Sequence, residues 1–239
     1  MKHHLILSLA LALMFPVVPA LSAADTSDSD PGSLKTDFEY FPLKYGSRWV
    51  YKEKNSSQSF IVKVAGYQNF TIKQKNANGV IVSTTIRCAR LETTMIGKKV
   101  ILGSELIGIS GDGVYRYKVG DQTVDPPARI LPIPCNNGVS WKIDSKIQDR
   151  MVRLEYAIDE DKITAPIGSA AKPTEVNALR LKANDFRVDE DKVEATVWYA
   201  KDIGMVKLDM QTGGVSFALE LEKTYSIEDW RKHSFFSIW

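Results

Sequence analysis

Histidine is almost absent from this 239-residue chain. Only three occur, and two of them, His3 and His4, stand within the first four residues. Once those residues are removed, His233 near the C-terminus is the only imidazole left. Ser-His-Asp or Cys-His catalysis would depend on that single side chain, and a metal site built from several histidines is excluded by count. We therefore expect no catalytic residue, no bound metal and no cofactor.

Cysteine is equally scarce, because Cys88 and Cys135 are the only two in the chain. Neither lies near the start, so the usual bacterial lipid anchor on an N-terminal cysteine is not expected. In an oxidising compartment the pair could form a disulfide, which would contribute about 4 kcal/mol in the loop-entropy model. The alternative is two buried reduced thiols. The sequence leaves both open, because geometry decides between them.

The chain also lacks a strong net charge. Without Lys2, which lies in the predicted signal peptide, 30 basic residues face 29 acidic ones. No basic stripe is available to neutralise phosphate groups. Nucleic acid is therefore not an expected partner.

The one long apolar run lies at the start. A basic segment, Met1–His4, precedes the apolar run Leu5–Val18, and small residues follow. This is the three-part layout of a secretory signal peptide. The run is shorter than the roughly 20 residues of a membrane span. We predict a signal peptide over residues 1–24 with cleavage after Ala24, although nearby small residues offer two earlier positions. The mature protein is then periplasmic or secreted, and not a transmembrane protein.

The sequence after the predicted signal peptide divides into three further segments. Residues 25–37 are rich in Ser and Asp and poor in apolar side chains, which predicts a disordered linker. We expect a single β domain over residues 38–225 and a C-terminal appendage over residues 226–239. Ser226 followed by acidic residues is typical of a helix start, so a short helix ending near His233 is predicted.

Apolar residues recur at every second position through most of the expected domain. Charged residues often stand between them, as Arg116 and Lys118 do between Tyr115, Tyr117 and Val119. Such alternation predicts strands with one dry face and one wet face. The clearest runs are Phe60–Val64, Tyr115–Val119, Val152–Ile158, Val193–Tyr199, Val206–Met210 and Phe217–Leu221.

Turn signals separate these runs at short intervals. They are Asn76–Gly79, Gly97–Lys99, Gly111–Gly113, Asn136–Gly138 and Thr212–Gly214. Each supplies residues that tolerate positive φ, as tight hairpins require. About ten to thirteen strands joined mostly by hairpins predict an all-β antiparallel meander that must curl or close to bury its apolar face. A curved sheet, a half-barrel, a barrel or a sandwich would each do so.

Three segments resemble secreted bacterial β-rich domains of unknown function. Tyr40–Tyr51 is similar to their opening strand (FPLxxGxxWxY), and Trp198–Lys207 resembles the strand, turn and strand near their end (WYAxxxGxVK). Ile163–Gly168 resembles an xTxPxG turn before a strand at Val176–Leu181, but Ser169–Thr174 is an insertion, which leaves the pairing of that strand open. The resemblance implies no catalytic residue. By fold analogy alone, an exported curved sheet is also similar to the LolA and LppX type of lipoprotein-carrier half-barrel.

The acidic clusters that we weighed as possible sites are Asp159–Asp161 and Asp189–Asp191. Neither has the glycine-hinged spacing of a calcium loop. Paired carboxylates for glycoside hydrolysis need a fixed separation that the sequence does not supply. We interpret both clusters as solvated hairpin tips with Lys162 and Lys192 beside the acids.

Aromatic side chains are the remaining candidates for a ligand site. Trp49, Trp141, Trp198 and Tyr199 could line an apolar cavity or stack on sugar rings, or they could simply fill the core. Our hypothesis is an exported non-catalytic binding module, for a lipid or another apolar ligand. The alternative is a structural module that contacts envelope proteins or polysaccharide, and a hydrolase is the least favoured.

Overall fold

Antiparallel strands form nearly all of the structure. The computed structural model describes residues 37–56, 58–75, 78–98, 100–167, 172–226 and 229. The predicted signal peptide and nearly all of the predicted linker lie outside these ranges. No helix in the described ranges is long and apolar enough to cross a membrane.

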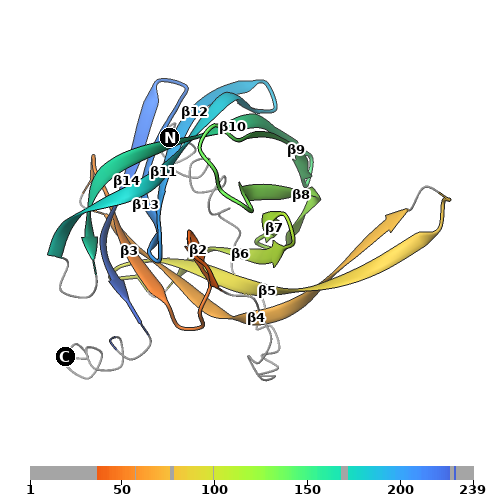
Figure 1. Ribbon diagram of the computed structural model, residues 1–239, viewed down its shortest axis with the longest axis horizontal. Coiled ribbons are helices and arrows are strands. Elements are labelled where there is room, and N and C mark those ends of the chain that lie inside the picture. The colour runs from red at the N-terminus through yellow and green to blue at the C-terminus, as the bar shows by residue number, and fades with distance from the viewer. Residues whose placement is uncertain are drawn as a thin grey trace.

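Twelve of the described strands close into one barrel (Figure 1). Each strand pairs with the next along the chain, and β14 pairs with β3 to close the ring. The strands are β3 (Arg48–Glu53), β4 (Ser59–Lys75), β5 (Ile81–Met95), β6 (Ile101–Ser110), β7 (Gly113–Val119), β8 (Gln122–Pro132), β9 (Ser140–Ile147), β10 (Arg150–Ile167), β11 (Lys172–Val188), β12 (Asp191–Ala200), β13 (Gly204–Thr212) and β14 (Val215–Tyr225). The all-β antiparallel prediction is confirmed, and among the four architectures the barrel is the one that forms. The half-barrel of the fold analogy is not formed, because the sheet closes.

The seam between β8 and β9 is the weakest in its backbone ladder. Only Val124↔Ile147 and Asp125↔Lys146 are paired there, and prolines at positions 126 and 127 supply no N–H to continue the ladder. Side chains replace the missing bonds. Trp141 donates its indole N–H to the Arg129 carbonyl at 2.7 Å, and the Ser145 hydroxyl donates to the Pro126 carbonyl at 2.8 Å.

Alternation places the apolar residues of most strands inside the barrel, as predicted. The core includes alternate residues of the predicted runs: Phe60, Val62, Val64, Val152, Leu154, Ile158, Val193, Val197, Tyr199, Val206, Leu208, Met210, Phe217, Leu219 and Leu221. Predicted turns at Gly79, Gly97, Gly138, Gly213 and Gly214 adopt positive φ.

Strand β7 breaks the predicted alternation. Register shifts on both of its sides interrupt the two-residue period, one at Leu106/Ile107 and two within β7. As a result Arg116, which we placed on the wet face, lines the barrel interior. Tyr117 instead joins Cys88 and Leu106 in a small separate cluster. The prediction of one dry face through Tyr115, Tyr117 and Val119 was therefore wrong, because β-bulges re-aim the side chains of this strand.

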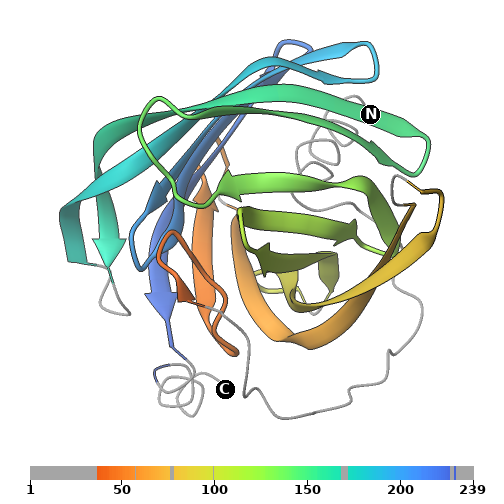
Figure 2. The same cartoon turned by 45° about the vertical axis from the view of Figure 1, so that its right-hand side comes forward.

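Two hairpins are longer than the sequence pattern indicated. The hairpin of β4 and β5 extends beyond the ring (Figures 1 and 2), and its ladder continues to Lys75↔Ile81. The hairpin of β10 and β11 pairs from Val152↔Val188 to Ile167↔Lys172. In the segment that we predicted as a turn, Ile163–Gly168, strand β10 thus continues through Ile167, and Gly168 lies outside the described residues.

A small hairpin of β1 (Asp37–Phe38) and β2 (Phe41–Pro42) leads into the barrel. Its Glu39 carbonyl accepts the Asp202 N–H from the β12–β13 turn, and Lys201 forms an ion pair with the Glu39 carboxylate at 2.7 Å. Leu43, which follows this hairpin, is completely buried. These contacts fasten the start of the domain to the β12–β13 turn.

The two cysteines are free thiols, so the disulfide that we considered is not formed. Cys88 belongs to the small cluster with Leu106 and Tyr117, whereas Cys135 packs against the main core. The Cys135 thiol donates to the Pro132 carbonyl at 2.9 Å. The reduced alternative is the one that the structure contains, because the two thiols belong to different clusters.

At the C-terminal end, Ser226 and Asp229 form a capping box. The Ser226 hydroxyl accepts the Asp229 N–H at 3.1 Å, and the Asp229 carboxylate accepts the Ser226 N–H at 3.3 Å. The rest of the predicted C-terminal helix, including His233, lies outside the described residues.

Candidate functional site

The barrel interior contains a cavity of about 80 Å³ beside the β1–β2 hairpin, which we call the proximal cavity. Its walls come from nine strands: β2, β3, β4, β5, β6, β7, β8, β12 and β13. Its lining is mostly apolar. The lining residues are Phe41, Pro42, Trp49, Tyr51, Val62, Leu91, Glu105, Arg116, Ile130, Tyr199, Gly204 and Met205.

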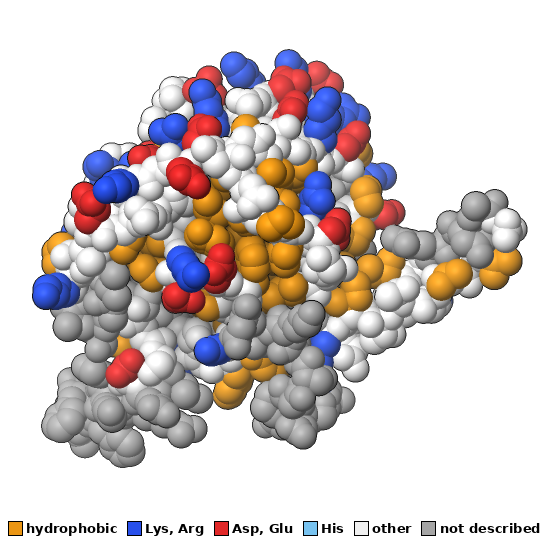
Figure 3. All heavy atoms as spheres, viewed as in Figure 1, with side chains coloured by type: hydrophobic (Ala, Val, Ile, Leu, Met, Phe, Trp, Pro, Cys, Tyr) orange, Lys and Arg blue, Asp and Glu red, His pale blue; other side chains and the backbone are white. Residues whose placement is uncertain are grey.

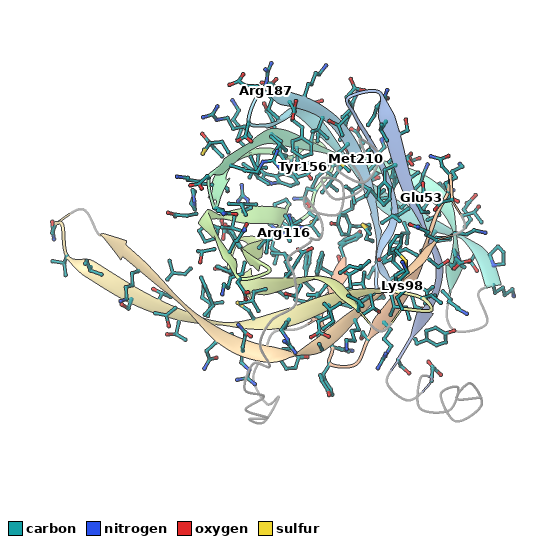
Figure 4. The ribbon with its side chains drawn as sticks, turned by 180° about the vertical axis from the view of Figure 1, so that it is seen from behind. Glu53, Lys98, Arg116, Tyr156, Arg187 and Met210 are labelled. Atoms are coloured by element: carbon teal, nitrogen blue, oxygen red, sulfur yellow. The ribbon has the colours of Figure 1, made fainter. Side chains whose placement is uncertain are left out.

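A second cavity of about 80 Å³ is lined by residues of strands β7 to β13, and we call it the distal cavity. Arg116, Ile130 and Tyr199 line both cavities. The other walls of the distal cavity are Val124, Ala128, Ile143, Ser145, Ile147, Val152, Leu154, Tyr156, Phe186, Ala195, Val197, Leu208 and Met210. Figure 4 shows Arg116, Tyr156 and Met210 within the ring of strands, whereas Arg187 lies on its outer side. The interior is thus two apolar-walled spaces that meet at one polar layer.

An ion pair forms the charged part of this layer. Arg116 Nε donates to Glu105 Oε2 at 2.6 Å, and the side chains of both residues are largely buried. Burial raises the pKa of the Glu105 carboxyl, and Arg116 offsets part of that rise. Burial alone would lower the pKa of Arg116, but the charge and hydrogen bond of Glu105 outweigh it and raise that pKa. The layer therefore carries a cation and an anion whose charges cancel.

Two tyrosine hydroxyls complete the layer. Tyr199 is 6% exposed and lines both cavities, and Tyr156 lines the distal one. Burial raises the pKa of both phenols, so both remain neutral donors at physiological pH. Neither hydroxyl makes a hydrogen bond within the described ranges, whereas the Tyr51 hydroxyl donates to the Met205 carbonyl at 3.0 Å. A hydroxyl that lines a cavity and has no partner among the described residues can donate a hydrogen bond to a bound acceptor, so these two hydroxyls suit a ligand with a carbonyl or hydroxyl oxygen.

The proximal cavity is closed at one end by β2 and β3. The Phe41 ring lies 5.8 Å from the Tyr199 ring, centroid to centroid, and the Trp49 indole N–H donates to the Ile203 carbonyl at 2.6 Å. Gly204 has φ of 94°, and a Cβ atom there would stand 3.4 Å from Pro42. Pro42 and Trp49 also line a more open groove of about 470 Å³, so they separate the interior from that groove.

The structure brings together two of the four aromatic candidates. Trp49 and Tyr199 both line the proximal cavity. Trp141 is buried 5.2 Å from the Tyr156 ring, but it lines neither cavity and its indole supports the β8–β9 seam. Trp198 does not join them, because Val197 and Tyr199 on either side of it point inward. Its indole donates to Asp161 at 3.0 Å, and the Lys207 ammonium lies 4.6 Å from its ring centroid.

The acidic clusters lie on hydrogen-bonded outer positions. Asp189 is at the β11–β12 turn, as we predicted, and its carboxylate accepts the Met151 N–H at 2.9 Å and the Arg150 Nε at 3.0 Å. Asp159–Asp161 instead lies inside β10, so the prediction of a hairpin tip there was wrong because the strand continues. No group of three His, Cys, Asp or Glu that could hold a metal is found in the described part of the chain.

Sequence reasoning missed Glu105 and Arg116. Both stand in alternating strands where a charged residue is ordinarily assigned to the wet face. The only available signal was that Glu105 follows Ser104 and precedes Leu106–Ile107, where adjacent apolar residues leave the inward position undecided. Register shifts that decide it depend on the neighbouring strands.

Comparisons with known proteins give no family. No family model matches the chain, and no curated protein matches it. Among solved structures, a proposed lipoprotein from Parabacteroides distasonis ATCC 8503 is similar with a TM-score of 0.38 and 14% identity. A proposed exported protein with a YmcC-like fold from Bacteroides fragilis NCTC 9343 has a TM-score of 0.45 and 12% identity. Each alignment covers 78% of this chain and 98% of the other. Neither score is high enough to place this chain in a family with them.

Proposed function

We propose that this protein is an exported, non-catalytic binding module that takes a slim amphipathic ligand, such as a single acyl chain with a neutral polar group, inside its barrel. The signal-peptide layout of residues 1–24 supports export to the periplasm or beyond. The observation that carries the proposal is the pair of apolar cavities meeting at a polar layer in which the Tyr199 hydroxyl has no protein partner within the described ranges.

The size of the cavities selects a slim ligand. Pockets for drug-sized molecules usually measure about 300–1,000 Å³, whereas each cavity here measures about 80 Å³. Met205 and Met210 line one cavity each, and methionine side chains adapt to an inserted chain more readily than branched ones. One acyl chain extending through both cavities fits this shape better than a two-chain lipid.

The charges of the layer select a neutral polar group. Glu105 already neutralises Arg116, so a carboxylate placed beside them would add an unbalanced buried anion. An ester carbonyl or a hydroxyl adds no charge and can accept a hydrogen bond from Tyr199 or Tyr156. We therefore expect a monoacylglycerol to bind better than the free fatty acid of the same chain length.

Native mass spectrometry and organic extraction of protein purified from its own envelope test for a bound lipid directly. Displacement of the neutral fluorophore phenylnaphthylamine then ranks monoacylglycerol against fatty acid. Tyr199→Phe should weaken monoacylglycerol about fivefold, the worth of one hydrogen bond. Ala195→Leu, which fills the distal cavity, should abolish displacement of the fluorophore by monoacylglycerol.

Trp198→Phe is the matched control, because this aromatic residue lies on the outer side of β12 and should not change binding. Binding that responds to Trp198→Phe but not to Ala195→Leu would place the ligand outside the barrel. Protein that carries no lipid and does not bind the fluorophore would remove the proposal.

A further inference from the structure

The extended part of the β4–β5 hairpin is a two-stranded ribbon outside the ring. We call residues 66–75 and 78–88 the arm. Strand β4 pairs with β3 only over Ser59–Lys63, and β5 pairs with β6 only over Ala89–Thr94. Within the described residues, the strands of the arm therefore pair only with each other (Figure 1). An isolated ribbon of this kind adds little to the stability of the barrel.

The end of the arm is apolar and exposed. Val80, Ile81 and Val82 are 58%, 61% and 47% exposed, and the first two are the most exposed large apolar residues that the structure describes. Apolar side chains gather along the arm in Figure 3, whereas charges of both signs cover the upper part of the barrel. Three adjacent aliphatic residues at the tip of a projecting hairpin mark a contact surface.

All the charged residues of the arm are basic. No Asp or Glu occurs between Glu53 and Glu92, while Lys73, Lys75 and Arg87 lie in the arm. The rest of the mature chain balances acids and bases. Lys73 is exposed and has no ion-pair partner among the residues that the structure describes. An acid-free segment with several cations favours a negatively charged partner.

The register of the ribbon separates the cations from part of the apolar surface. Lys73 is opposite Ser83, and Phe70 is opposite Ile86 on the other face. Phe70 and Ile86 pack against the small cluster of Cys88, Leu106 and Tyr117. The ribbon is therefore amphipathic, with its base anchored to the barrel by one face and its apolar tip left in water.

We propose that the arm docks the protein on an anionic lipid bilayer, with Val80–Val82 inserted at the interface and the cations beside lipid phosphates. Apolar insertion combined with cationic attraction is the arrangement that holds peripheral proteins on membranes. A protein partner that added a strand to the ribbon would use the backbone edges and would not require three exposed aliphatic side chains at the tip. This inference goes beyond the ligand proposal and does not depend on it.

Vesicle sedimentation with the purified protein tests the proposal. Vesicles of phosphatidylglycerol mixed with phosphatidylcholine should bind at least about tenfold more strongly than phosphatidylcholine alone, and salt at about 0.5 M should reduce that difference. The variant Val80→Ser/Ile81→Ser/Val82→Ser should bind at least about tenfold more weakly. Lys73→Gln should bind about fivefold more weakly.

The matched control replaces three aliphatic residues at the opposite end of β5. Ile96, Val100 and Ile101 are 43–53% exposed, and changing all three to Ser should leave vesicle binding unchanged. Circular dichroism of each variant verifies that the barrel is intact. Equal binding to neutral and anionic vesicles, or equal loss in the control variant, would overturn the proposal. So would protein that ignores vesicles but forms a dimer that the tip variant abolishes, because the tip would then contact a second copy.

Discussion

Breaking the Glu105–Arg116 pair on one side should destabilise the barrel far more than replacing both residues. At 2.6 Å and an effective dielectric constant of about 20, the attraction is about 6 kcal/mol. Desolvation of two buried ions costs several kcal/mol each, so the net contribution of the pair is small. A lone buried ion has no such compensation. We expect Glu105→Leu to cost about 3–5 kcal/mol, and Glu105→Leu/Arg116→Met to lie within about 1 kcal/mol of wild type.

The two single variants should differ in their pH dependence. In Arg116→Met, Glu105 can escape its unpaired charge by protonation, which Arg116 cannot do by deprotonation when Glu105 is removed. Burial already raises the pKa of Glu105 above its ordinary value, and loss of Arg116 removes the opposing influence. A carboxyl with a raised folded-state pKa has no penalty below its unfolded pKa and destabilises increasingly as pH rises above it. Arg116→Met should therefore be less destabilised at pH 5 than at pH 8, and Glu105→Leu should show no such change.

Urea unfolding followed by tryptophan fluorescence at both pH values completes a double-mutant cycle. Coupling of several kcal/mol is expected, with the m value unchanged among the four proteins. Single variants that each cost less than about 1 kcal/mol and add without coupling would mean that water reaches the pair. In that case the interior would not be the dry space on which the ligand proposal depends.

Two further outcomes follow from the structure. Burial raises the pKa of Cys88 and of Cys135 to about 12, which lowers the thiolate fraction about a thousandfold relative to a free thiol. A thiol reagent at pH 8 should therefore react with almost no group in the native protein and with two groups after unfolding without reductant. No reactive group after unfolding would mean that the cysteines form a disulfide. Hydrogen bonds from Met151 and Arg150 hold the pKa of Asp189 below 3.8, so its stabilising contribution is present above pH about 4 and is lost as the pH falls through the lower folded-state value. Asp189→Asn, which tolerates the φ of 56°, should be less stable than wild type at pH 6 and equal to it near pH 2, and a difference that persists at low pH would show that the turn, not the charge, was altered.

The sequence predicts those parts of the fold that depend on local chemistry. Alternation in Val193–Tyr199 and Phe217–Leu221 places their apolar residues in the core, because one wet face and one dry face impose a period of two. Glycines at 138, 213 and 214 mark hairpins because they adopt positive φ at no steric cost. Trp49 and Tyr199, chosen for their aromatic rings, do line the same cavity.

The remaining features depend on pairings that no single strand encodes. Arg116 points inward because β6 and β8 impose register shifts on β7. Strand β10 continues through Ile163–Ile167 because β11 pairs with it, although the sequence Ile163–Gly168 resembles a turn. Closure requires β3 and β14 to meet, and these strands are separated by most of the chain. Trp198 and Tyr199 are adjacent aromatic residues that the sequence does not distinguish. The alternation of side chains along β12 is what directs Tyr199 into the barrel and Trp198 outward.

The double variant separates what the fold requires from what binding requires. A barrel gains nothing in stability from an interior ion pair that well-packed apolar residues could replace. The Tyr199 hydroxyl, which lines both cavities, likewise adds no hydrogen bond to the described part of the fold. If these groups serve a ligand, Glu105→Leu/Arg116→Met should fold as stably as wild type but lose the preference for monoacylglycerol over a hydrocarbon of equal length. A double variant that keeps that preference would show that the pair does not select the ligand, and would leave Tyr199 and Tyr156 as the polar groups that do.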